Sequence, residues 1–189
     1  PPKLMDLPVF VGTISSVTGH LGAFEATVDK YAPVQVSSRT AFETGQQKTD
    51  SVKLQADLVI DISTGDALVT APEKRDGYFH PDVGNPALVQ KALFEATDLV
   101  GEFEKPRYIK YDAEICVHAR STQVGCTRCL DICPTGAITP GNDEVVINPY
   151  ICAGCGSCAS VCPTGAAKYE LPAENFIYER LKLLLDSYV

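Results

Sequence analysis

Hydrophobic residues in the first part of the chain occur in short runs separated by polar or glycine-containing stretches. Short runs rich in β-branched and aromatic residues are typical of strands. We predict strands at Leu7–Val11, His20–Val28, Pro33–Ser37 and Leu54–Ile62, of which the last has the strongest pattern. Residues 38–53 are predicted to be loop or short helix, and residues 63–85 mostly loop.

Two segments show helical spacing. Asn85 and Pro86 are a capping residue and a favoured first helical residue, so we predict a helix from there to about Gly101. A second helix is predicted from Ala173 to Tyr188. Its apolar face consists of Phe176, Ile177, Leu181, Leu184 and Leu185.

The region between these helices contains an internal repeat. Residues 126–137 (CTRCLDICPTGA) align with residues 155–166 (CGSCASVCPTGA) at an offset of 29. Each repeat is predicted to begin with a strand, at about Arg107–Tyr111 and Glu144–Ile147. A short helix should follow Cys129 and Cys158 and end at each Cys-Pro pair, because the residue before a proline avoids the α region.

These elements predict an α+β chain in three parts. Residues 1–105 form a small α/β domain, residues 106–171 form the duplicated module, and residues 172–189 form a C-terminal helix. No apolar run approaches the roughly 20 residues that span a bilayer. The chain starts with Pro1 and lacks a leader pattern, so we expect a fragment of a longer protein or a processed form.

The formal net charge of the chain is −8. This acidity disfavours binding to nucleic acid or to an anionic membrane, and it favours a protein partner with a basic docking face. The alternative is that the acidity only keeps the protein soluble. The sequence does not indicate an oligomeric state.

All eight cysteines lie between residues 116 and 162, in two runs. The second run has the spacing C-x2-C-x2-C-x3-C-P, and the first has C-x9-C-x2-C-x3-C-P. The compact spacing is the ligand signature of [4Fe–4S] clusters, so we predict two such clusters. Zinc is an alternative that the spacing disfavours, because zinc sites use two C-x2-C pairs separated by a longer spacer. Closely spaced thiols are poor disulfide partners and fit a reducing compartment, which predicts a cytoplasmic location.

The first run is complete although its first cysteine is displaced. Residues 111–115 (YDAEI) precede Cys116 as residues 147–151 (INPYI) precede Cys152, so the two cysteines are counterparts. Residues 117–123 are then an insertion that contains His118 and Arg120. We expect this insertion to be a solvated loop, or to place one of these side chains against a cluster. His118 is not expected to bind iron, because four cysteines suffice for each cluster.

In runs of this type the fourth cysteine binds the other cluster. The predicted ligands of the first cluster are Cys116, Cys126, Cys129 and Cys162. Those of the second cluster are Cys133, Cys152, Cys155 and Cys158. Small residues such as Gly154 and Gly156 should let backbone N–H groups approach the sulfurs. The first run carries larger residues, so the two clusters should differ in potential.

Residues 106–171 resemble the bacterial-type dicluster ferredoxins. Residues 152–163 match the ligand motif of that family in full and residues 126–134 match its first motif, whereas the displaced Cys116 departs from it. The resemblance implies a ferredoxin-like module of two short hairpins and two helices around two clusters, with low-potential one-electron transfer. Residues 125–134 are also similar to larger bacterial 4Fe–4S binding proteins, in which such a module is part of a longer redox chain.

The sequence therefore predicts an electron-transfer protein that relays single electrons between a protein donor and a protein acceptor. Residues 1–105 contain no dinucleotide-binding or P-loop motif, so a scaffold or docking role is expected, without catalytic activity of the chain itself. One alternative is an electron-transfer subunit of a larger oxidoreductase. Another is an iron–sulfur redox sensor, to which only the extended loop after Cys116 points.

Overall fold

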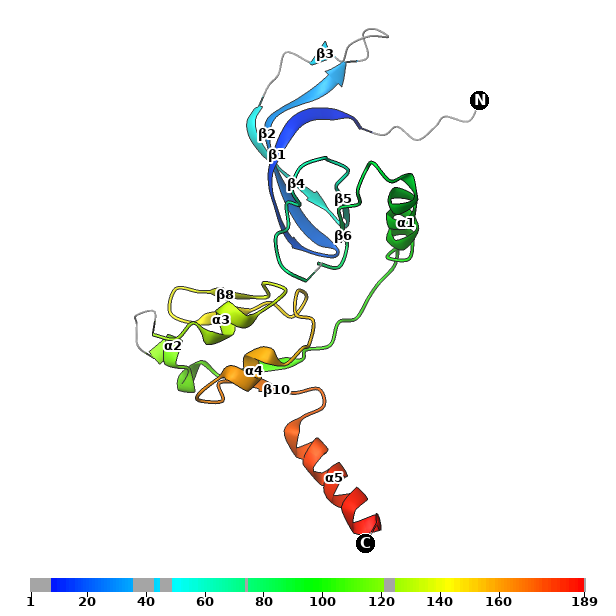
Figure 1. Cartoon of the computed structure of the whole chain (residues 1–189). Coiled ribbons are helices and arrows are strands. Elements are labelled where there is room, and N and C mark those ends of the chain that lie inside the picture. The colour runs from blue at the N-terminus through cyan, green and yellow to red at the C-terminus, as the bar shows by residue number, and fades with distance from the viewer. Residues whose placement is uncertain (1–7, 36–42, 45–48, 74, 121–124, 189) are drawn as a thin grey trace. The chain divides into compact units, whose positions relative to one another are not determined.

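The computed structural model describes residues 8–35, 43–44, 49–73, 75–120 and 125–188. The chain divides into two compact units. The first comprises residues 1–70 and 76–99, and the second comprises residues 71–75 and 100–189. Both units combine short helices with small sheets, so the chain is a mixed α and β structure (Figure 1).

An antiparallel sheet dominates the first unit. Its central strand β2 (Ala23–Gln35) pairs with β1 (Phe10–His20) on one side, and with β4 (Thr49–Ala56) and the short β3 (Glu43–Thr44) on the other. The turn between β1 and β2 is tight, and Gly22 within it has a φ of 81°. Two further short strands, β5 (Val59–Ile60) and β6 (Tyr78–Phe79), pair in parallel.

The structure differs from the predicted strands of this unit in extent. β1 begins at Phe10 and continues to His20 through residues 12–19, for which no strand is predicted. β2 joins most of two predicted strands into one, and the end of the second, residues 36–37, lies outside the described residues. The predicted strand Leu54–Ile62 is interrupted at Asp57, whose carbonyl accepts a hydrogen bond from Gly22 N–H at 2.8 Å. Pairing along β2, rather than apolar content, decides where these strands run.

The first predicted helix is confirmed as α1 (Pro86–Thr97). The Asn85 side chain accepts a hydrogen bond from Ala87 N–H at 3.1 Å, as a capping residue does. The helix ends at Thr97 rather than near Gly101. Residues 63–85 are mostly loop, as predicted, except for β6.

The second unit contains two antiparallel strand pairs. β7 (Ile109–Tyr111) pairs with β10 (Ala167–Tyr169), and β8 (Ile138–Pro140) pairs with β9 (Val145–Ile147). The short helices α3 (Arg128–Ile132) and α4 (Ser157–Val161) precede the two Cys-Pro pairs, as predicted. The 3-10 turn η1 (Ala113–Ile115) precedes Cys116, and the insertion that follows this cysteine contains the short helix α2 (Val117–Arg120).

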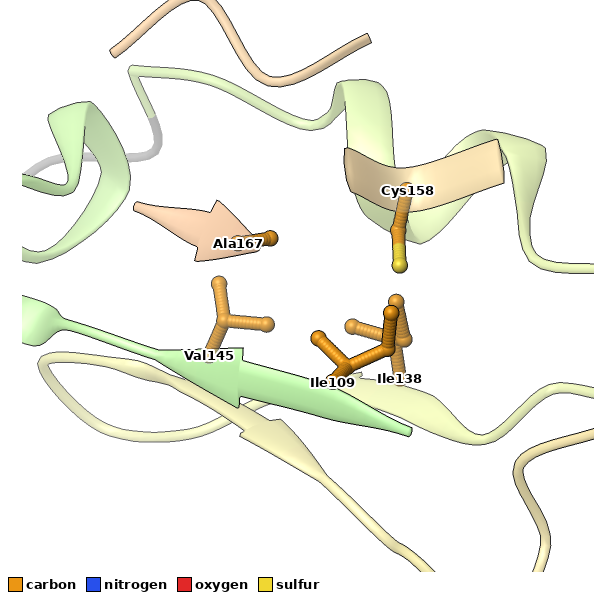
Figure 2. Close-up of a cluster of buried hydrophobic side chains, with 5 residues drawn as sticks. All are labelled: Ile109, Ile138, Val145, Cys158 and Ala167. Atoms are coloured by element: carbon orange, nitrogen blue, oxygen red, sulfur yellow. The ribbon is translucent and has the colours of Figure 1, made fainter. Parts of the chain in front are cut away.

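Both strand pairs contribute to one small core, which is drawn in Figure 2. Its buried members are Ile109, Ile138, Val145, Cys158 and Ala167. In Figure 2 the Cys158 sulfur points from α4 toward the isoleucine side chains. Because each repeat supplies only part of this core, neither repeat can bury its apolar side chains alone.

The C-terminal helix α5 (Glu174–Tyr188) forms over the predicted residues. None of its residues is buried, so its predicted apolar face is exposed in this structure. No helix in the described part of the chain is long and apolar enough to cross a lipid bilayer.

Candidate metal centre

The eight cysteines of the second unit line two cavities. The cysteines that line the first are Cys116, Cys126, Cys129 and Cys162. The cysteines that line the second are Cys133, Cys152, Cys155 and Cys158. We call them cavity one and cavity two. Each contains three cysteines from one repeat and one from the other.

The Cys-Pro pairs explain how one cysteine of each run leaves its own repeat. Cys133 directly follows α3 and has φ −71° and ψ 109°, which is extended backbone. Cys162 follows α4 with φ −71° and ψ 113°, almost the same values. The next residue is proline in both cases, and it keeps the preceding residue out of the helical region. Each of these cysteines therefore lines the other repeat's cavity, although Cys129 and Cys158 lie only one helical turn earlier.

A local cap places the displaced Cys116. The Asp112 side chain accepts a hydrogen bond from Glu114 N–H at 3.0 Å at the start of η1, and Cys116 ends that turn. The Cys116 N–H donates to the Ala113 carbonyl at 3.2 Å. Cys116 is buried and reaches cavity one despite the insertion that follows it.

The loop between Cys152 and Cys158 requires a glycine for a reason that the sequence does not reveal. Gly154 has a φ of 71°, and a Cβ atom on it would lie 2.7 Å from the Tyr108 ring. That ring stacks with Tyr169 at a centroid distance of 6.4 Å. Gly154 therefore leaves space for an aromatic pair as well as for the backbone of the cysteine loop.

Several hydrogen bonds reach the cysteine sulfurs. Ala167 N–H donates to Cys162 Sγ at 3.5 Å, and Ser157 Oγ lies 3.4 Å from Cys155 Sγ. Hydrogen bonds from the side chain and backbone of Ser157 lower the pKa of Cys155. Burial acts to raise the pKa of Cys162, but the hydrogen bonds outweigh it and the pKa is lowered. Both effects favour the thiolate, which is the form that binds metal.

At two other cysteines the surroundings favour the protonated thiol instead of the thiolate. Burial raises the pKa of the Cys158 thiol to about 11, and burial together with the neighbouring cysteines raises that of Cys129. Such buried thiols ionise when a positively charged metal group binds them. Four cysteine sulfurs at each cavity are the donor set that binds an iron–sulfur cluster.

The insertion is not simply a solvated loop. Its residues 117–120 form α2, and His118 is buried with 7% of its surface exposed, whereas Arg120 is exposed. His118 Nδ1 lies 2.9 Å from the Cys126 carbonyl, and since a carbonyl only accepts, Nδ1–H is the donor. The hydrogen bond links the two sides of the insertion rather than reaching a sulfur. Residues 121–123 lie outside the described residues.

Three further residues near the cavities are not predicted from the sequence. Tyr111 lines cavity one, and burial and its hydrogen bond with Cys116 raise its pKa to about 12. Thr135 lines cavity two, and its hydroxyl lies 3.6 Å from Cys133 Sγ. Arg75 donates to the Thr135 carbonyl at 3.3 Å across 60 residues of sequence. Tyr111 and Thr135 lie near the cysteine runs and could have been suspected, whereas nothing in the sequence marks Arg75.

Comparison with known proteins supports this assignment of the second unit. Residues 123–166 match the family model of the 4Fe-4S dicluster domain. The match contains every cysteine except Cys116. A search of curated proteins found no match. Residues 123–166 are therefore a 4Fe–4S ferredoxin-type domain, and the eight cysteines fit its two [4Fe–4S] clusters, which give the chain an iron–sulfur electron-transfer role.

The hydrogen bond of His118 leads to a prediction. Replacing His118 with Ala removes the donor that holds α2 to Cys126, so Cys116 should be displaced from cavity one. We expect iron loss from this cavity in air to become about 10-fold faster, the lower end of the effect of removing outer-shell partners. Iron content against time measures this. His118→Asn, which keeps a donor near the Nδ1 position, should restore slow loss, whereas equal loss in both variants would contradict a positioning role.

Proposed function

We propose that this chain is a one-electron carrier that relays electrons between a protein donor and a protein acceptor through two [4Fe–4S] clusters. The observation that carries the proposal is the arrangement of the cysteines in two cavities, four to each. A one-electron carrier needs a bound redox centre and no substrate pocket. The acidic net charge of −8 supports a partner with a basic docking face.

The ligand sets follow the cavities. The first cluster is bound by Cys116, Cys126, Cys129 and Cys162. The second cluster is bound by Cys133, Cys152, Cys155 and Cys158. The sulfur hydrogen bonds of Cys155 and Cys162 support this assignment, because hydrogen bonds to ligand sulfurs tune the potentials of such clusters.

The crossed ligands bring the clusters close together. Cys129 and Cys133 are four residues apart around α3 but belong to different ligand sets, and the same holds for Cys158 and Cys162 around α4. In each pair the first cysteine lies on the helix and the second directly follows it. Each short helix is thus shared by both clusters, which suits electron transfer within the module.

The remaining parts of the chain have supporting roles in this proposal. Residues 106–171 are the ferredoxin-like module, residues 1–105 provide a scaffold or docking domain, and residues 172–189 form the terminal helix. The chain has no catalytic activity of its own in this scheme. Its unpaired, closely spaced cysteines suit the reducing cytoplasm.

A second candidate is an electron-transfer subunit of a larger oxidoreductase. It is favoured by α5, on which Ile177, Leu181 and Leu184 follow one another along one face and are each about half exposed. Exposed apolar faces of this kind mark sites of association. The two candidates share the same electron relay and differ in whether a catalytic centre is attached.

The relay is tested by electron transfer from the reduced protein to a basic haem protein such as cytochrome c. We expect transfer to slow by about 10-fold or more as the ionic strength rises from 0.01 to about 0.5 M, because salt screens the attraction of the acidic carrier. Stopped-flow absorbance measures the rate. Lack of electron uptake from dithionite would contradict the proposed function, and a salt-independent rate would contradict the basic docking face.

The ligand assignment is tested at Cys116, the cysteine that the insertion separates from the rest of its run. Cys116→Ser should lower the iron content by one to about four atoms per chain, since the cluster of cavity one loses one of its four thiolates. Elemental analysis and electron paramagnetic resonance follow the loss, with Ser121→Ala in the same insertion as a control. Cys116 is not a ligand if the variant keeps its full iron content and an unchanged spectrum.

A further inference from the structure

A segment from the first hundred residues belongs to the cluster-binding unit. Residues 71–75 group with residues 100–189, although they lie between parts of the first unit in sequence. Glu73 N–H donates to the Pro134 carbonyl at 3.1 Å, and Arg75 Nη2 donates to the Thr135 carbonyl at 3.3 Å. We call residues 71–75 the covering segment, because both contacts fall on the turn that follows Cys133.

The internal repeat provides a comparison within the same chain. Residues 133–136 and 162–165 have the identical sequence Cys-Pro-Thr-Gly. Thr135 is buried, with 6% of its surface exposed, whereas its counterpart Thr164 is exposed. Both threonine hydroxyls lie near the preceding cysteine sulfur, at 3.6 Å for Cys133 and 3.9 Å for Cys162. The two turns therefore match in sequence and in this contact. They differ in burial, because residues 71–75 contact the turn after Cys133 whereas Thr164 is exposed.

The covering segment brings charges of both signs to cavity two. The negative charge of Glu73 acts to raise the pKa of Cys155, and Arg75 supplies a positive charge beside Thr135. Arg75 is half-buried, and burial lowers its pKa, yet an arginine side chain stays protonated in proteins. Its guanidinium contacts Thr135, which lines cavity two and lies beside Cys133. A half-buried charge is screened less by salt than an exposed one. In cavity one the corresponding cation is Arg128, which is exposed.

We propose that Arg75 is a positioning residue whose side chain makes reduction in cavity two more favourable than it would be without that side chain. It holds the turn after Cys133 through Thr135, and its charge stabilises the negative charge that one added electron brings. An electron supplied by the protein donor would then occupy cavity two to a greater extent than it would without Arg75, and no atom is transferred. This inference rests on the proposed function and on its ligand sets.

The test is a redox titration of the intact, cluster-loaded protein followed by electron paramagnetic resonance. Arg75→Gln should lower one of the two midpoint potentials, so that the equilibrium constant for placing the electron in cavity two falls about 3- to 10-fold. A tenfold fall corresponds to 59 mV for one electron. Arg75→Lys should retain most of the wild-type potential because it keeps the charge.

Two matched variants separate the effect from a general change in charge. Lys182→Gln removes the same charge from the exposed helix α5 and should leave both potentials unchanged. Arg128→Gln, on the wall of cavity one, should lower the other potential. The inference is overturned if Arg75→Gln leaves both potentials at their wild-type values, or if Arg75→Lys shifts them, or depletes iron, as much as Arg75→Gln does. It is also overturned if Arg75→Gln and Arg128→Gln lower the same potential.

These outcomes are distinct from a failure of the proposed function. If the wild-type protein accepts electrons at two centres but Arg75 has no selective effect, the carrier function stands and the role of Arg75 is rejected. If the wild-type protein accepts no electrons, the proposed function fails and the inference fails with it.

Discussion

The proline after the fourth cysteine of each run is the constraint on which the cluster-binding unit depends. It holds Cys133 and Cys162 in nearly identical extended conformations directly after α3 and α4. If either helix continued, its last cysteine would stay with its own repeat. Because the helices end there, each repeat contributes one sulfur to the other's cavity, and the two repeats also share one core. Folding and ligand placement are thus parts of the same arrangement.

The two repeats supply equivalent sets of cysteines, but the residues that surround these cysteines differ between the two cavities. Cavity one carries the insertion, which His118 holds to Cys126 from a buried position. Cavity two has the compact loop, with Gly154 against Tyr108, and the covering segment with Arg75. Such differences in hydrogen bonding, burial and charge are what set the potentials of otherwise similar clusters. The unequal potentials predicted from the cysteine loops stay a prediction, and these differences in the surroundings of the two cavities would add to them.

The features that could be predicted from the sequence are those with local causes. Ligand spacing, the Cys-Pro pairs and the cap at Asn85 each involve residues close together in the chain, and the structure has helices and turns at these positions. The extents of β1 and β4 could not be predicted, because polar residues there are held by pairing with β2. The role of Gly154 and the contact of Arg75 depend on residues distant in sequence. The burial of His118 depends on how the insertion folds back onto Cys126.

The central claim is that one chain holds two [4Fe–4S] clusters in crossed sets of cysteines. Its most direct test is iron and acid-labile sulfide analysis of anaerobically purified protein, combined with electron paramagnetic resonance after reduction. The account predicts about eight irons and eight sulfides per chain, with a spectrum of two magnetically interacting clusters. About two zinc ions without sulfide, or about four irons with the spectrum of one isolated cluster, would contradict it.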